Sequence, residues 1–175
     1  FSPTDQIAVE NYNGAGSDYY LFSTAVYRDP SAWYHIVAVW DSGNATAANR
    51  QLVYINGVQV TAVTTGNAIP LNATSVINSA TTHNIGRSTN AAQYFDGYIA
   101  EQYFIDGQAL TPSSFGETNS DGVWMPKSYT GTYGTNGFYL PFTNTTSTTT
   151  LGNDSSGNGN NWTTNNFPLT AGTTY

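Results

Sequence analysis

The chain has 175 residues, a formal charge of −7 from 11 acidic and 4 basic residues, 14% aromatic residues and no cysteine. This length suits one domain, or one domain and part of a second. The aromatic content argues against a disordered acidic tail, the four scattered bases argue against a nucleic-acid partner, and the lack of cysteine excludes disulfides and thiolate chemistry.

Short runs of Val, Ile, Tyr, Phe and Thr alternate with Gly, Asn, Ser and Asp along most of the chain. This spacing is typical of an all-β antiparallel sandwich. The longest apolar run, residues 36–40, is far shorter than the ~20 residues of a membrane span. The predicted strands are residues 6–12, 19–26, 33–40, 51–55, 58–63, 84–87, 98–105 and 137–142.

Three local predictions stand out among these elements. In the strand at 33–40, the residues that face each side are largely apolar. This pattern predicts a central strand buried on both faces. Asn56-Gly57 predicts a type I′ hairpin turn, because both residues tolerate positive φ. Thr111 and Pro112 suit the N-cap and first position of a single helical turn at 111–115.

The composition changes near residue 117. Residues 117–134 read as loop, and residues 143–166 are dominated by Thr, Asn, Ser and Gly. We therefore expect a β-sandwich over residues 1–116 and a loop-rich extension over 117–175 that carries the strand at 137–142. Residue 1 is Phe rather than Met, and we expect the chain to be part of a longer product.

Four segments together resemble a known family. Residues 31–41 (Ser-Ala-Trp-Tyr-His-Ile-Val-Ala-Val-Trp-Asp), 52–58 (Leu-Val-Tyr-Ile-Asn-Gly-Val), 84–87 (Asn-Ile-Gly-Arg) and 95–111 occur in the order found in laminin-G-like, concanavalin A-like jelly rolls. The ending Ile-Asp-Gly-Gln-Ala-Leu-Thr-Pro (105–112) also resembles virion and tail-fibre proteins of phages. The resemblance implies a jelly-roll sandwich working outside the cell or on a virion.

The sequence departs from that family in two places. Ala100 stands where the family has Asp in its closing strand, and few strands precede Trp33. Residues 154–161 (Asp-Ser-Ser-Gly-Asn-Gly-Asn-Asn) resemble the turn that opens such a domain. Three explanations fit: a fragment spanning two modules, a circular permutation, or a subunit whose tail completes a neighbour.

No set of catalytic residues emerges. Retaining glucanases of this fold need two carboxylates about 5–5.5 Å apart, but none of the three glutamates (Glu10, Glu101 and Glu117) is spaced two or four from another acid within a strand. His35 is interpreted as a structural hydrogen-bonding residue. We therefore expect no enzymatic activity.

Calcium is the one cofactor that the sequence suggests. Asp154, Ser156 and Asn158 occupy positions 1, 3 and 5 of a loop with Gly159 at position 6, as in a calcium loop. Position 12 is Asn165, so the bidentate carboxylate is missing, and a plain Asx/Gly turn is the favoured alternative. Asp41, Asp96 and Asp106 are weaker candidates.

Loop aromatics are candidates for stacking on sugar rings. Trp124, Tyr129 and Tyr133 are the predicted glycan-binding residues, with core packing as an equal alternative, whereas Trp33 and Trp40 are expected in the core. The Asn-x-Ser/Thr pattern also predicts glycosylation. Its acceptors are Asn44, Asn72, Asn144, Asn153 and Asn161.

These observations favour a non-enzymatic structural or adhesion protein, extracellular or on a virion surface. We expect it to be a subunit of a homo-oligomer, fibre or coat that assembles by strand contacts, with residues 137–175 completing a neighbour. The alternatives are a lectin-like module that binds polysaccharide and, more remotely, a glucanase-like glycosidase.

Overall fold

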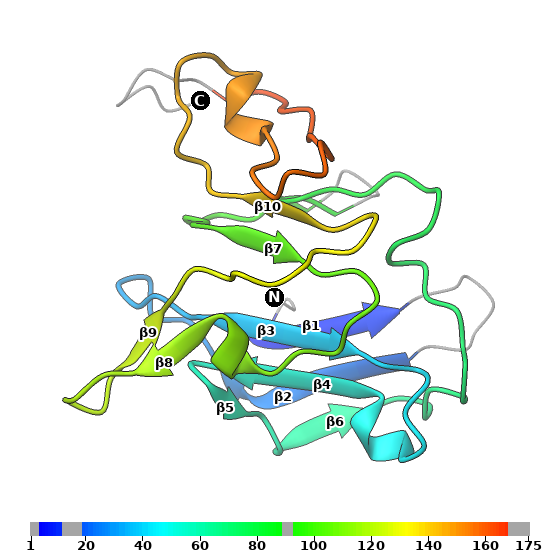
Figure 1. Cartoon of the computed structure of the whole chain (residues 1–175). Helices are drawn as coiled ribbons and strands as arrows, with labels where there is room; N and C mark the ends of the chain where they lie inside the picture. Colours follow the sequence, from blue (N-terminus) through cyan, green and yellow to red (C-terminus); the bar gives the residue numbers. More distant parts are fainter. Residues whose placement is uncertain (1–3, 12–18, 89–92, 168–175) are drawn as a thin grey trace. The chain divides into compact units, whose positions relative to one another are not determined.

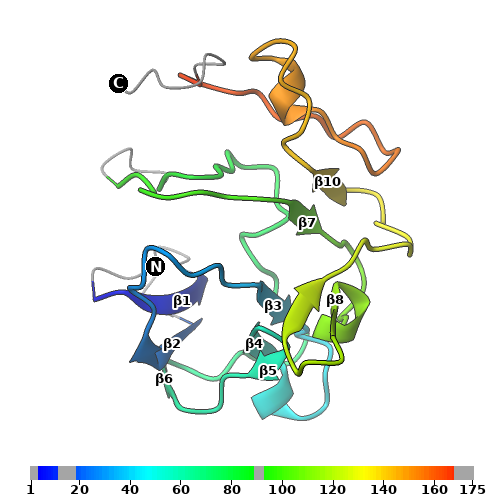
Figure 2. The same cartoon turned by 90° about the vertical axis from the view of Figure 1, so that its left-hand side faces the viewer.

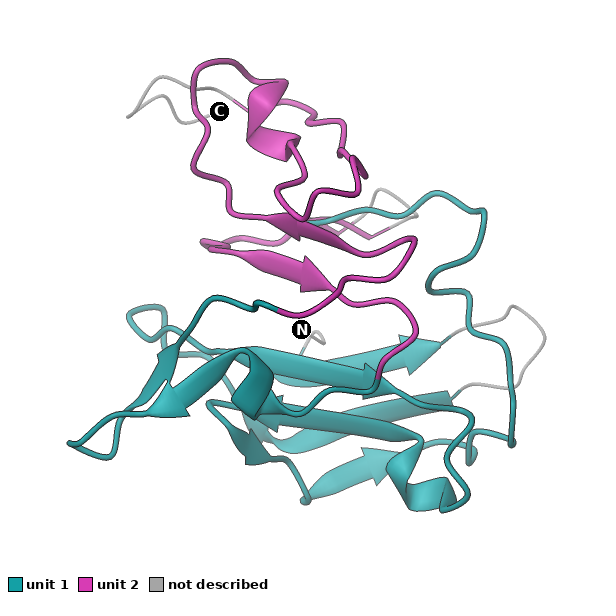
Figure 3. Cartoon of the chain, viewed as in Figure 1, with its two compact units in different colours: residues 1–85, 109–130 teal, residues 86–108, 131–175 magenta. Residues whose placement is uncertain are grey.

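Residues 4–11, 19–88 and 93–167 are described in a computed structural model of the chain, and within them strands far outnumber helical turns (Figure 1). The chain divides into two compact units, residues 1–85 with 109–130 (unit 1) and residues 86–108 with 131–175 (unit 2) (Figure 3). The prediction of a domain boundary near residue 117 stays a prediction.

Unit 1 contains two antiparallel three-stranded sheets. The first has the order β1 (Gln6–Asn11), β2 (Tyr19–Val26) and β6 (Val63–Thr65), and the second has the order β3 (Ile36–Trp40), β4 (Gln51–Ile55) and β5 (Val58–Gln59). They form two layers, seen in the turned view of Figure 2. The predicted antiparallel β-sandwich is confirmed.

The core of unit 1 lies between these two layers. Ile7 and Leu21 come from the first sheet, Val53 and Ile55 come from the second, and each is at most 8% exposed. Because side chains alternate along a strand, Val53 and Ile55 share the inner face of β4. Leu52 and Tyr54 therefore point to the opposite, outer face.

The predicted hairpin turn is confirmed. Asn56 has a φ of 49° and Gly57 a φ of 80°, as a type I′ turn requires. The single strand predicted at residues 58–63 was wrong, because the segment divides. β5 continues the hairpin with β4, whereas β6 pairs with β2 in the other sheet.

The prediction of a central strand at residues 33–40 was also wrong. β3 begins at Ile36 and forms the edge of its sheet, and β4 takes the central position. Trp33 precedes the strand and is 65% exposed, so it does not pack in the core. Trp40 is half-buried, with its ring 6.3 Å from that of Tyr19. Apolar residues on both faces do not distinguish a central strand from an edge strand.

A short hairpin completes unit 1. The expected turn appears as a 3₁₀ helix at Pro112–Ser114, and β8 (Gly116–Thr118) and β9 (Trp124–Pro126) follow it. The Asn119 side chain accepts hydrogen bonds from the backbone N–H groups of Asp121 and Val123, which shapes the turn between the strands. This hairpin falls in a segment that was predicted to be loop.

In its described residues, unit 2 contains a two-stranded antiparallel sheet. β7 (Gln102–Phe104) pairs with β10 (Phe138–Leu140), and Phe138 and Leu140 are buried. The Trp162 ring packs edge-on against Phe138 at 5.1 Å. No strand covers the predicted 84–87 segment, where the structure has only an isolated bridge between Arg87 and Tyr94. Two further 3₁₀ turns, Ala47–Asn49 and Thr150–Gly152, lie in loops of unit 1 and unit 2 respectively.

Candidate functional site

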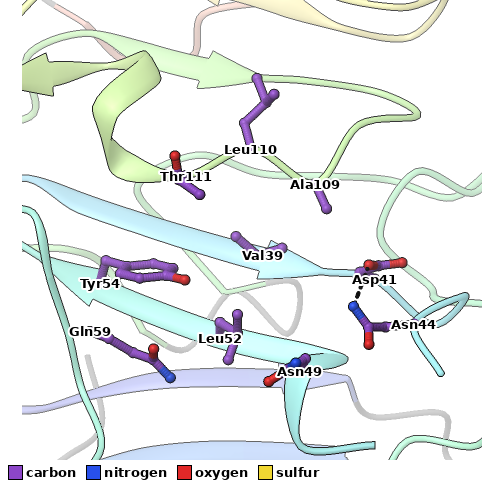
Figure 4. A pocket seen from close by; sticks show the side chains of 10 residues that line it. All are labelled: Val39, Asp41, Asn44, Asn49, Leu52, Tyr54, Gln59, Ala109, Leu110 and Thr111. Carbon is purple, nitrogen blue, oxygen red and sulfur yellow. Dashed lines mark hydrogen bonds between the residues drawn. The ribbon is translucent and has the colours of Figure 1, made fainter. Parts of the chain in front are cut away.

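A pocket of about 310 Å³ lies on the outer face of the β3–β4–β5 sheet (Figure 4). Its floor is formed by side chains that share this face because they are direct partners across the strands: Val39 is opposite Leu52, and Tyr54 is opposite Gln59. The volume falls at the lower end of the range for small-molecule sites.

The walls of the pocket come from two loops. Asp41, Asn44 and Asn49 lie in the connection between β3 and β4, and Ala109–Thr111 approach from the segment before the Pro112–Ser114 turn. In Figure 4 the segment of Ala109, Leu110 and Thr111 lies across from the strands, with the Ala109 methyl group directed toward them and the Leu110 side chain directed away. Apolar surface and hydrogen-bonding groups therefore surround the same space.

Arg50 holds the β3–β4 loop in shape. Its Nε donates to the Asn44 carbonyl at 2.8 Å, its Nη1 to the Ile69 carbonyl at 2.7 Å and its Nη2 to the Ala45 carbonyl at 3.3 Å. Arg50 thus donates hydrogen bonds to backbone carbonyls of Asn44, Ala45 and Ile69, which lie outside the strands. Arg50 supports the wall without lining the pocket.

Asp41 is oriented by its neighbour in the loop. The Asn44 amide Nδ2 donates to Asp41 Oδ2 at 3.2 Å, and Asn44 Oδ1 accepts the Thr46 N–H at 3.0 Å. The pocket thus presents one carboxylate, three carboxamides and a phenol. Carboxylates and amides bond hydroxyl groups well, and the Tyr54 ring and the aliphatic side chains can contact C–H surfaces.

Comparison with known families decides the classification of the chain. Residues 1–114 match the family described as the concanavalin A-like lectin/glucanases superfamily. The chain belongs to this family. The predicted resemblance to laminin-G-like, concanavalin A-like jelly rolls is therefore confirmed, and the matched residues contain the whole lining of the pocket. Neither a curated protein nor a solved structure matches the chain.

The three aromatic residues predicted to bind glycan do not line the pocket of this concanavalin A-like chain. Trp124 is half-buried in β9, and its ring packs against Gly57 and Gly116. Tyr129 packs against Phe115, with the ring centres 5.1 Å apart. Tyr133 belongs to unit 2. Glycan binding by these residues stays a prediction.

The predicted calcium loop is held by hydrogen bonds within unit 2. Asp154 Oδ1 accepts the N–H groups of Tyr139 and Ser156, and Oδ2 accepts the Asn160 N–H and the Ser156 hydroxyl, all at 2.8–2.9 Å. The Asn158 Nδ2 donates to the carbonyls of Gly134 and Gly137. These contacts are those of an Asx turn, and calcium binding here stays a prediction.

Burial and hydrogen bonding act in opposite directions on the Asp154 carboxyl. Burial raises its pKa, but the hydrogen bonds from Tyr139, Ser156 and Asn160 outweigh that effect, so the pKa lies below the ordinary value of 3.8. The carboxylate therefore stays charged through the neutral range. Within the described parts of the chain, no group of three His, Cys, Asp or Glu side chains could hold a metal ion.

The predicted glycosylation acceptors differ in their surroundings. Asn72, Asn144, Asn153 and Asn161 are exposed, and Asn44 is half-buried in the pocket wall. Asn161 accepts the Asp154 N–H through its Oδ1 at 2.8 Å. Modification at all five stays a prediction. In the described segments, no helix is long and apolar enough to cross a membrane.

Sequence reasoning missed the pocket because its residues come from separate segments. Asp41 was singled out only as a weak calcium ligand, and Tyr54 only as part of a strand. The usable signal was the alternation in β4, where Val53 and Ile55 face the core, so Leu52 and Tyr54 must face outward. The approach of Ala109–Thr111 to this face leaves no trace in local sequence.

Proposed function

We propose that this chain is a non-enzymatic adhesion module that binds polysaccharide in the pocket on the outer face of the β3–β4–β5 sheet. The observation that carries the proposal is the lining itself: amide and carboxylate groups of Asp41, Asn44, Asn49 and Gln59 surround an apolar floor that includes the Tyr54 ring. This combination suits a sugar, which has hydroxyls at its rim and C–H groups on its faces.

The same lining argues against a glycosidase. Hydrolysis in enzymes of the usual kind needs two carboxyl groups, one as acid and one as nucleophile or base. Of the lining residues that the structure describes, Asp41 alone carries a carboxyl group. Binding without cleavage is therefore the better account of a pocket in a family that includes lectins and glucanases.

We also propose that the module works outside the cell or on the surface of a virion. The family resemblance, the low content of charged residues (9%) and the abundance of Thr and Asn support a protein displayed outside the cell or on a virion. A surface poor in charge and rich in hydroxyl and amide groups forms hydrogen bonds with hydrated polysaccharides.

The binding test is a glycan array followed by titration of the sugars that bind. We expect Tyr54→Ala and Asp41→Ala to weaken binding at least about tenfold, because each removes a group that faces the pocket. Tyr129→Ala and Tyr133→Ala serve as matched controls outside the lining, and they also test the residues that the sequence predicted. Binding that is lost in the controls and retained in the pocket variants would show that the site lies at Tyr129 and Tyr133 rather than in the pocket.

An activity assay is the second arm of that test. Incubation with laminarin or other glucans that bind is expected to release no new reducing ends. Release that disappears in Asp41→Ala would instead identify a glycosidase.

A structural role in a fibre or coat is a second candidate, and one observation favours it. β3 is a five-residue apolar strand at the edge of its sheet, and in the described part of unit 1 no strand pairs with its other side. Such edges accept strands from other chains. Electron micrographs of the purified native protein would show whether it polymerises.

A further inference from the structure

The groups in the pocket also bear on which sugars it would accept. This step rests on the proposed polysaccharide binding and deepens it. We propose that the pocket selects uncharged sugars and rejects those that carry carboxylate or sulfate groups, and that Asp41 is the residue that sets this selectivity.

The first support is the charge of the lining. Asp41 is half-buried after the end of β3, and no Lys, Arg or His is among the described residues that line the pocket. A like charge placed about 4 Å from this carboxylate is repelled even in water, and more strongly where protein displaces solvent. The carboxylate accepts hydrogen bonds from hydroxyls but offers nothing to an anion.

The second support is that the Lys and Arg side chains of unit 1 in the described residues have other partners. Arg50, the base closest along the chain to Asp41, donates through its Nε, Nη1 and Nη2 to three carbonyl groups of the protein. Arg28 lies 3.7 Å from Asp5, and Lys127 lies 3.7 Å from Glu117. A sulfated or uronic-acid sugar would have to draw one of these cations away from its partner.

The third support is the Asn44 amide, which holds the Asp41 carboxylate in place through the bond to Oδ2. A carboxylate that is fixed in this way cannot turn away from an incoming anion without losing that bond. The net charge of −7 adds a weaker, long-range repulsion of the same sign.

The test uses matched ligands. Neutral β-glucan oligosaccharides are compared with the same oligosaccharides oxidised at C6 to glucuronic acids, by titration calorimetry at low and at physiological salt. We expect the oxidised ligands to bind at least ~5-fold more weakly, as like charges at about 4 Å imply, and the difference to shrink as salt rises.

Two charge-neutralising variants locate the origin of the effect. Asp41→Asn keeps the shape of the side chain and is expected to recover most of the lost binding of the oxidised ligands. Asp121→Asn, in the exposed β8–β9 turn, changes the net charge by the same one unit and is expected to leave the discrimination unchanged.

The outcomes separate this inference from the proposed function. If neither ligand set binds, polysaccharide binding itself is wrong. If both sets bind equally, or the oxidised set binds more tightly, the module binds sugars but the selectivity proposed here is wrong. Discrimination that survives Asp41→Asn unchanged would overturn the role of Asp41, and folding of that variant is checked by its circular dichroism spectrum.

Discussion

Trp124 is held between glycines from two different elements. A Cβ built on Gly57, in the hairpin turn between β4 and β5, would lie 2.4 Å from the Trp124 ring, and one built on Gly116, in β8, would lie 2.5 Å from it. The ring centre is also 5.8 Å from that of His35. Trp124 thus ties the β8–β9 hairpin to the turn of the second sheet.

Gly116→Ala is expected to destabilise the protein by about 1–3 kcal/mol, because the added methyl group would overlap the Trp124 indole and must displace it. Gly116 has no positive φ, so the effect isolates packing from backbone strain. Urea denaturation measures it.

The control for this change is a double-mutant cycle with Trp124→Ala. Once the indole is absent, adding the methyl group at residue 116 should cost almost nothing. Equal destabilisation by Gly116→Ala in both backgrounds would show that the ring contact is not the cause.

The Asx loop at residues 154–160 is held by many hydrogen bonds of unit 2. It joins Asp154 to the backbone of β10 and the side-chain amides of Asn158 and Asn160 to the carbonyl of Gly137. Because the Asp154 carboxylate organises the loop, the order of the loop depends on its charge.

Acid should loosen this loop before the core of unit 1. Hydrogen bonding in the folded state lowers the Asp154 pKa below 3.8. The stabilisation that the charged carboxylate gives the folded loop is therefore fully present above the unfolded pKa of 3.8, and it is lost as the pH falls through the lower pKa of the folded state. The protection of the Tyr139, Ser156 and Asn160 amides against hydrogen exchange, relative to an unfolded chain at the same pH, should fall in that range.

Asp154→Asn is expected to give the same lower protection of these amides at neutral pH, with no further loss of protection on acidification. Protection that is high and unchanged by pH in both proteins would contradict this role. A calcium titration in the same assay tests the alternative, because slower exchange with added calcium would show that the loop binds the ion.

Strands could be predicted from the sequence where clear signals mark both of their ends. The ranges of β2 and β4 were predicted correctly, since apolar and β-branched runs end there at polar or turn residues. β3 was placed wrongly within its sheet, because strand order depends on partners that its own residues do not identify. β8 and β9 were missed, because three-residue strands are too short for alternation to show.

The pocket was harder to predict than the fold. Its floor follows from the alternation in β4, but its Leu110 wall is more than fifty residues further along the chain than Tyr54. Only the folded chain brings the two together. The turn within the Asp154 loop could be expected from the sequence, because Asp154 bonds Ser156 and Asn160 a few residues away, but the bonds of the loop to Tyr139 and Gly137 could not.

The strand edges that already have hydrogen-bond partners limit how copies of the chain could assemble. β10 pairs with β7 of its own chain, and its other side is occupied at Tyr139, whose N–H donates to the Asp154 carboxylate and whose carbonyl accepts the Ser155 N–H. Within the described residues, β10 is thus bonded on both sides. Completion of a neighbour by residues 137–175 stays a prediction, and the β3 edge is the alternative that can be tested directly.

The geometry of β3 provides a selective test of that edge. The Asn56 N–H donates to the His35 carbonyl, and the Asp41 N–H donates to the Arg50 carbonyl, so odd-numbered residues of β3 exchange bonds with β4 and the N–H of exposed Ala38 points away from it. Proline is tolerated on an edge strand at such a position. Ala38→Pro should therefore keep the β3–β4 ladder and remove one donor that an added strand would need.

We expect Ala38→Pro to reduce the assembly of the chain to monomers of 18.8 kDa, measured by analytical ultracentrifugation and electron microscopy. Ala38→Val is the matched control, because it adds side-chain bulk at the same position but retains the N–H. An Ala38→Pro protein that assembles as the parent does would exclude the β3 edge. A parent protein that stays monomeric at all concentrations would exclude the assembly role itself and leave glycan binding as the function to test.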